Sequence, residues 1–190
     1  VCGTTLAGAP KTPVETAAVQ SSPPPFTRTE EREPCSNYTT ERRPLFGDLH
    51  VHTAWSFDAS SQDTRNTPAD AYRFAQGAPM GIQPYDESGR ATRTIQLDRP
   101  LDFTAVTDHS EFLGEVHMCT TPGEPGYWHP VCLIQRHIPR YTFWTFGAAG
   151  LSYKHRWGLC GEDNAICAEK AAGMWRQIQQ AAEDACDRSS

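Results

Sequence analysis

The sequence predicts an α/β fold, and three observations support this assignment. Segments with strand character alternate with segments of helical period, which is the pattern of α/β proteins. Hydrophobic residues make up 38% and aromatic residues 10% of the 190 residues, which is enough for a folded core. The mean hydropathy is −0.58, and no apolar run approaches the ~20 residues that cross a bilayer, so we expect no transmembrane helix.

The first 40 residues are expected to form an export or linker tail. Seven of the 15 prolines lie in residues 1–44, and a run of three, residues 23–25, predicts an extended segment. Cys2 could carry the lipid anchor of a bacterial lipoprotein, or residues 7–9 (Ala-Gly-Ala) could be a signal-peptidase site. Both interpretations predict export to the periplasm, the outer membrane or the exterior of a bacterium. The alternative is an ordinary disordered tail.

A folded domain is predicted over residues 41–190, and it begins with a strand. Residues 45–52 (LFGDLHVH) predict a short strand that runs into a loop. A helix is predicted from Pro68 to Ala75, with Thr67 as its N-cap, proline at its first position and Gly77 as its end.

Two further strand regions follow that helix. Residues 80–99 contain the turn sequence Glu-Ser-Gly-Arg at 87–90, which predicts a hairpin. Residues 101–107 (LDFTAVT) are apolar and β-branched, and they predict a buried strand that ends at Asp108.

Residues 115–162 predict an irregular, disulfide-bearing insert. Seven cysteines occur in the chain without a CxxC pair, which favours an oxidising compartment over a zinc ribbon. Cys119 with Cys132, and Cys160 with Cys167, are the nearest-neighbour pairings, although the sequence alone does not fix the connectivity. The alternative is that these cysteines are free and buried.

The insert is also rich in aromatic residues. Eight of them fall in residues 127–157: Tyr127, Trp128, Tyr141, Phe143, Trp144, Phe146, Tyr153 and Trp157. They could form one wall of a substrate pocket, or they could form a small core for the insert beside its disulfides.

A helix is predicted over residues 164–184, capped by Asp163 or Asn164. Its apolar residues recur at helical spacing and predict one buried face: Ala171, Met174, Trp175, Ile178, Ala182 and Ala185. One or two strand–helix units cannot close a barrel, and the chain stops after a helix. We therefore expect the amino-terminal part of a larger protein.

The pattern from residue 47 to residue 58 (GDLHVHTAWSFD) predicts a metal site. His50 and His52 lie at i and i+2 of a strand, so both imidazoles project from one face. Asp58 can fold back from the next loop as a carboxylate ligand, and this donor set suits Zn, Mn or Fe. Asp48 lies on the same face and could orient a ligand through an outer hydrogen bond. The alternative is a pair of half-buried structural histidines.

A second motif lies where the next buried strand ends, which is where α/β folds place their active sites. Residues 107–110 read Thr-Asp-His-Ser. His109 is a candidate metal ligand, and Asp108 is a candidate catalytic residue that either partners His109 or bridges metals. The alternative is a loop histidine that is bonded to Asp108.

These two motifs resemble the first two motifs of the PHP (polymerase and histidinol phosphatase) superfamily. The amino-acid sequence of residues 47–60 and 102–114 is similar to that of an exported, mostly uncharacterised bacterial branch of this superfamily, which includes a PHP-type arylsulfatase. The resemblance covers about residues 40–190. It implies the amino-terminal portion of a distorted (β/α)7 barrel with two or three divalent transition metals, and His50, His52, Asp58 and His109 match its metal ligands.

The sequence also departs from the pattern of this superfamily. The later Glu, His and Asp-x-His ligands of the superfamily are not identifiable after His109. The remaining histidines have no motif around them and are interpreted as residues of the insert: His117, His129, His137 and His155. The chain is therefore expected to carry about half of a metal site.

The resemblance implies a hydrolase of phosphate or sulfate esters that uses a metal-activated hydroxide as the nucleophile. The expected partner is a small anionic ester, with Trp55 and the aromatic insert beside it. The net charge of −6 lacks the basic footprint of a nucleic-acid binder. Two alternatives remain, a non-catalytic secreted module held by disulfides and an amidohydrolase-type barrel.

Overall fold

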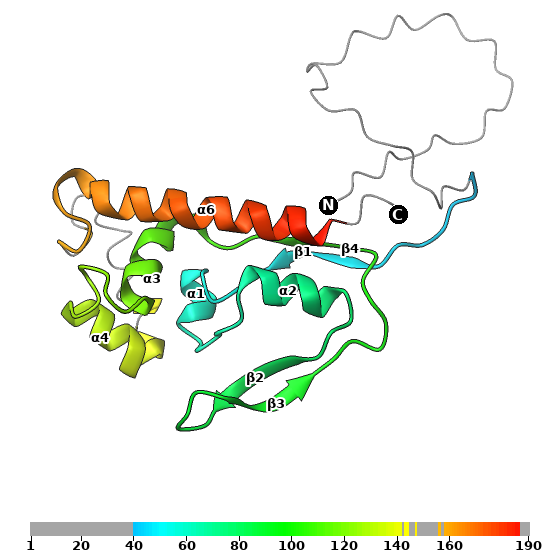
Figure 1. Ribbon diagram of the computed structural model, residues 1–190, viewed down its shortest axis with the longest axis horizontal. Coiled ribbons are helices and arrows are strands. Elements are labelled where there is room, and N and C mark those ends of the chain that lie inside the picture. Colours follow the sequence, from blue (N-terminus) through cyan, green and yellow to red (C-terminus); the bar gives the residue numbers. More distant parts are fainter. Residues whose placement is uncertain (1–39, 142, 145–146, 148–155, 157, 187–190) are drawn as a thin grey trace, which may run out of the picture. The chain divides into compact units, whose positions relative to one another are not determined.

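The computed structural model contains two small β-sheets and describes residues 40–141, 143–144, 147, 156 and 158–186 (Figure 1). Strand β1 (Gly47–Val51) pairs in parallel with β4 (Phe103–Val106), with Gly47 opposite Phe103 and Val51 opposite Val106. Strands β2 (Met80–Tyr85) and β3 (Ala91–Ile95) form an antiparallel hairpin. The predicted α/β class, both strand regions and the hairpin are confirmed.

Residues 45–186 form one compact unit. Besides the helical residues 139–141, 143, 144 and 147, five α-helices accompany the sheets within its described part. They are α1 (Phe57–Ser60), α2 (Pro68–Ala75), α3 (Leu113–Thr120), α4 (Pro130–His137) and α6 (Ala165–Ala185). Helix α3 packs against both α4 and α6, and α2 packs against β4 and α6. The predicted tail over residues 1–40 lies outside the described residues, apart from its last residue.

Helix α2 has the predicted bounds, and its start shows why. Thr67 Oγ1 accepts a hydrogen bond from the Asp70 backbone N–H, and the Asp70 carboxylate accepts one from the Thr67 N–H. This capping box satisfies two backbone donors that a helix start otherwise leaves unpaired. Gly77 follows the helix with φ of +92°, a conformation that glycine adopts without strain.

The hairpin turn is organised by one carboxylate. Asp86 Oδ1 accepts hydrogen bonds from the backbone N–H groups of Ser88 and Arg90, both at 2.9 Å. Gly89 supplies the positive φ, +80°, that the turn requires. The predicted turn at residues 87–90 therefore lies where expected.

The parallel sheet is less buried than predicted. All four residues of β4 are half-buried, and most of β1 is exposed, including Leu49 at 59%. Parallel strands become fully buried only when helices cover both faces of the sheet. Within the described residues, β1 has β4 as its one strand neighbour, so the prediction of a buried strand over residues 101–107 was too strong.

The insert is not irregular throughout, because α3 and α4 supply its residues 115–120 and 130–137. Three apolar clusters surround α3, centred on Met118, on Val116 and on Leu113. A Cβ at Gly114 would overlap the backbone of Cys167, so glycine permits α3 and α6 to approach closely. The apolar residues of α3 and α4 look scattered in the sequence. These helices are stabilised by packing against neighbouring helices.

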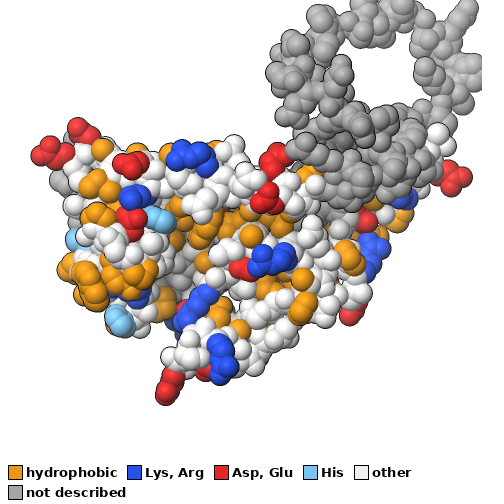
Figure 2. Space-filling view, in the orientation of Figure 1, with side chains coloured by type: hydrophobic (Ala, Val, Ile, Leu, Met, Phe, Trp, Pro, Cys, Tyr) orange, Lys and Arg blue, Asp and Glu red, His pale blue; other side chains and the backbone are white. Residues whose placement is uncertain are grey.

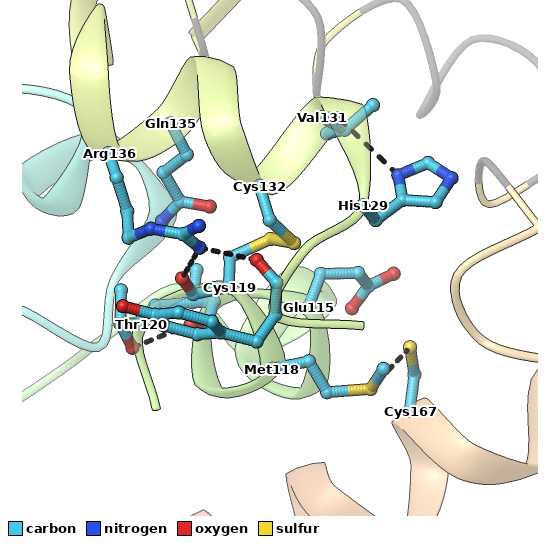
Figure 3. Close-up of a disulfide and its surroundings, with 12 residues drawn as sticks. Glu115, Met118, Cys119, Thr120, His129, Val131, Cys132, Gln135, Arg136 and Cys167 are labelled. Carbon is cyan, nitrogen blue, oxygen red and sulfur yellow. Dashed lines mark hydrogen bonds between the residues drawn. A yellow bond between two sulfur atoms is a disulfide. The ribbon is translucent and has the colours of Figure 1, made fainter. Parts of the chain in front are cut away.

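Both nearest-neighbour disulfides are present. The bond between Cys119 and Cys132 joins α3 to α4 (Figure 3). The bond between Cys160 and Cys167 joins α6 to the preceding loop. Arg136 reinforces the first connection, since its Nη1 donates to the carbonyl oxygen of Cys119 at 2.7 Å. Two disulfides are compatible with an exported protein. None of the described helices combines the length and apolarity needed to cross a membrane.

The described aromatic residues of the insert do not form its core. Trp128 is 76% exposed and Trp144 is 74% exposed, whereas the core beside the disulfides consists of sulfur and aliphatic groups. Figure 2 shows hydrophobic side chains gathered on the surface over α4. Phe146, Tyr153 and Trp157 lie outside the described residues.

Helix α6 begins at Ala165, and its buried face differs in part from the prediction. Met174 and Ile178 are buried, with Ala171 packed beside them, but Trp175 is half exposed. Asn164 occupies the N-cap position with a left-handed φ of 60° and makes no side-chain cap hydrogen bond. The predicted cap therefore has the right position but not the right interaction.

Candidate metal centre

The first part of the site forms where β1 ends. His52 follows β1 directly, and its Nδ1 lies 2.8 Å from Oδ2 of Asp58 in α1. Ser56 Oγ and the Ala59 backbone N–H both donate to Asp58 Oδ1, at 2.5 Å and 2.7 Å. Burial alone would raise the pKa of Asp58, but the hydrogen bonds from Ser56, His52 and Ala59 lower the pKa below its usual value. Asp58 is thus held as a carboxylate.

The second part comes from the end of β4. His109 Nε2 lies 3.7 Å from Asp58 Oδ2, and the His109 backbone N–H donates to Ser56 Oγ at 2.9 Å. Parallel pairing places the carboxyl ends of β1 and β4 at one edge of the sheet, which explains how residues so distant in sequence meet. Ser56 contacts both Asp58 and His109 and therefore ties the two strand ends together.

Three of the predicted ligands form a group. His52, Asp58 and His109 each offer one ligand atom, and these atoms all lie within 4.8 Å of one another. Their side chains are half-buried, with exposed fractions of 17%, 30% and 40%. Two imidazoles and a carboxylate that are open to solvent on one side match the donor preferences of Zn, Mn and Fe.

His50 and Asp48 lie beside this group. The His50 ring centroid is 4.7 Å from that of His52, yet His50 falls outside the three-residue group. Asp48 Oδ1 accepts a hydrogen bond from the His50 backbone N–H at 2.9 Å. Asp48 therefore orients the strand at His50 through the backbone, and the predicted contact with a ligand ring stays a prediction.

Asp108 holds the loop that follows β1. Its two carboxylate oxygens accept hydrogen bonds from the backbone N–H and the hydroxyl of Thr53, at 2.5 Å and 2.7 Å. Burial raises the pKa of Asp108 above its usual value, and the Thr53 hydrogen bonds offset part of that rise. Asp108 thus links the carboxyl end of β4 to the residue next to His52, and its catalytic role stays a prediction.

Trp55 lies beside an apolar cluster, and its predicted contact with a substrate stays a prediction. It packs against the apolar cluster of Leu113, Met174 and Ile178, which joins α3 to α6. The ring that approaches the site is Phe57, whose centroid lies 5.0 Å from the His109 ring and 6.0 Å from that of Phe143. Phe143 belongs to the aromatic-rich insert, so this stack places one aromatic residue of the insert near the site.

The sequence motifs did not single out three residues that organise the site, namely Thr53, Ser56 and Glu111. Thr53 and Ser56 are fully buried next to the ligands, and Glu111 Oε1 lies 3.2 Å from His109 Nδ1. A signal for Ser56 does exist, since it lies two positions before Asp58 in the same loop. The contact of Ser56 with His109 spans 53 positions and has no local signal.

A comparison with protein families bears directly on this centre. Residues 39–189, which include every residue of the centre, match the family described as "protein of unknown function (DUF3604)". The chain belongs to the DUF3604 family. No curated protein and no solved structure matches the chain. The DUF3604 match spans the metal-ligand group and both disulfides, so the family pattern covers the whole described unit.

Proposed function

We propose that this DUF3604 chain contributes to a metal-dependent hydrolase of phosphate or sulfate monoesters, with His52, Asp58 and His109 as the nucleus of the metal centre. The meeting of these three donors at the carboxyl ends of two parallel strands carries the proposal. The PHP-like order of the motifs supports it, and on that basis residues 41–190 form the amino-terminal part of a distorted barrel.

The donor set fits a divalent transition metal on chemical grounds. Asp58 is held ionised by its hydrogen bonds, and its Oδ2 lies between Nδ1 of His52 and Nε2 of His109. Metal-bound histidines usually have a second partner that fixes the ring, and Glu111 is in that position for His109 Nδ1. A divalent ion in such a site supplies Lewis acidity, which lowers the pKa of water to about 7 and offsets the charge of an anionic ester.

The protein residues around the donors have separate tasks in this proposal. Ser56 positions Asp58 and the backbone of His109 together. Asp108 fixes Thr53 and so sets the direction in which the chain leaves β1. Phe57 contacts the His109 ring, and Phe143 stacks on Phe57, so that aromatic rings lie beside one of the donors.

Metal content is the decisive measurement. The wild-type chain is expected to retain about one Zn, Mn or Fe ion per chain after dialysis, measured by elemental analysis. His52→Ala and His109→Ala should each lose that metal. His137→Ala is the matched control, because His137 is exposed in α4 and lies outside the ligand group. Equal metal content in all four proteins would refute the site.

Activity then separates the two ester classes. Hydrolysis of 4-nitrophenyl phosphate and 4-nitrophenyl sulfate is measured with the metal-loaded chain and with His109→Ala. A rate that falls with the metal supports the proposal, whereas metal without any hydrolysis would favour a metal-stabilised module. We also propose that the protein is exported, to the periplasm, the outer membrane or the exterior, in keeping with the two disulfides.

A further inference from the structure

A pocket of about 320 Å³ opens beside the candidate metal centre. Strand β1 contributes one side of it, α2 a second side and β2 a third. His52 belongs both to the wall of this pocket and to the metal-ligand group. The pocket and the centre therefore share one residue and lie next to each other.

Much of the wall away from His52 is apolar, and Thr64, Asn66, Gln83 and Thr104 add polar groups to it. Phe74 and Ala75 come from α2, Met80 and Ile82 from β2, and Leu101 from the segment before β4. Pockets for small molecules are usually lined in this way, with a few polar groups that fix the orientation of the ligand. The volume lies near the lower end of the ~300–1,000 Å³ range of such pockets, which suits one or two rings or an alkyl group of similar size.

The charges in the pocket disfavour an anion. Among the described residues that line the pocket, Asp48 is the acidic one, and none is Lys or Arg. Arg65 stacks over the ring of Tyr85 at 4.0 Å, but its charge is paired with Asp63 at 2.9 Å. An anionic group would therefore meet a like charge in the pocket without a compensating cation.

From these observations we infer that the pocket binds the uncharged, apolar part of a monoester whose anionic end faces His52, Asp58 and His109. This inference rests on the proposed function and adds to it the class of the ester: one anionic group joined to a compact, neutral, apolar alcohol. Esters that carry a second anionic group are excluded from this orientation by Asp48.

The test uses a neutral probe that resembles the alcohol alone. Binding of 2-naphthol to the wild-type chain after metal removal is measured by equilibrium dialysis, beside 6-hydroxy-2-naphthoate, which carries a carboxylate at the far end of the same ring system. Naphthol is expected to bind about fivefold more tightly than hydroxynaphthoate, because Asp48 repels the carboxylate. Asp48→Asn should reduce that difference while it leaves naphthol binding close to the wild-type value.

Two variants fill the pocket from opposite walls. Ala71→Leu enlarges a side chain of α2 that lines the pocket, and Ile82→Phe enlarges one of β2. Each should raise the Kd for naphthol about tenfold, a loss of about 1.4 kcal/mol of binding free energy. Ala172→Leu is the matched control, because Ala172 is exposed on α6 and lies outside the pocket. Thermal unfolding of each variant checks that the fold is retained.

The outcomes separate this inference from the proposed function. Loss of naphthol binding in folded Ala71→Leu or Ile82→Phe, with wild-type metal content, supports the pocket. An unchanged Kd in both folded variants, or no naphthol binding by the wild-type chain at millimolar concentration, overturns it. Failure of the metal centre would appear as absent metal in the wild-type chain, which elemental analysis detects independently of naphthol binding.

Discussion

Removal of the disulfide between α3 and α4 gives a prediction whose size follows from the structure. Cys119 and Cys132 are 13 positions apart, and both are fully buried. In the chain-entropy model, a cross-link that closes a loop of this size stabilises the folded state by about 3 kcal/mol. We expect Cys119→Ala/Cys132→Ala to lower the free energy of unfolding by about this amount, because alanine leaves neither a buried thiol nor a buried hydroxyl.

Urea denaturation under non-reducing conditions, followed by tryptophan fluorescence, measures this difference. Cys160→Ala/Cys167→Ala is the internal comparison, because its loop spans 7 positions and the same model gives about 2.5 kcal/mol. Wild-type protein treated with dithiothreitol should lose stability as well. If the Cys119/Cys132 variant stayed within about 0.5 kcal/mol of wild type, the cross-link would not hold α4 onto α3 and the reasoning would be wrong.

Three further predictions concern the rest of the unit. Thr67→Ala removes the cap of α2 and should cost about 1 kcal/mol of unfolding free energy, whereas an unchanged urea midpoint would show that the cap contributes nothing. The hydrogen bond from Lys170 holds the pKa of Glu124 below its ordinary value of 4.5, so this ion pair stabilises the fold above that pH and the contribution is lost as pH falls through the lower, folded-state pKa. Glu124→Gln should therefore flatten the acid side of the stability–pH curve, and an unaltered slope would contradict this assignment. Asp108→Ala leaves the buried N–H and hydroxyl of Thr53 without their acceptor and should lower the free energy of unfolding, measured in urea, by about 3 kcal/mol. A loss of less than about 1 kcal/mol would argue that Asp108 does not hold the loop after β1 through Thr53.

The elements that the sequence predicted well are those whose signals are local. Helix α2 depends on Thr67, Pro68 and Asp70, which lie within four positions of one another, and its observed bounds match the prediction. The hairpin turn depends on Asp86 and Gly89 in the same way. Both disulfides join cysteines that are neighbours along the chain.

Predictions failed where long-range packing decides the structure. Helices α3 and α4 were missed because their apolar residues face three separate clusters instead of one continuous stripe. Trp175 fits the helical spacing of the apolar face of α6, yet it is half exposed, because the described partners of α6 cover Met174 and Ile178 instead. The packing of Trp55 on the apolar cluster between α3 and α6 also had no local signal in the sequence.

For the candidate site, the sequence alone supplied the donor types and their order along the chain. His52, Asp58 and His109 could be chosen as candidate ligands because metal ligands are chemically restricted and the strand ends have a recognisable pattern. The tertiary structure decided which donors meet: the parallel pairing of β1 with β4 brings His109 to Asp58, and His50 falls outside the group. It also decided that both oxygens of Asp108 contact Thr53 and that an apolar pocket opens beside His52. The physical reason is that ligand chemistry is a property of single residues, whereas distances and cavities depend on packing between segments far apart in the chain.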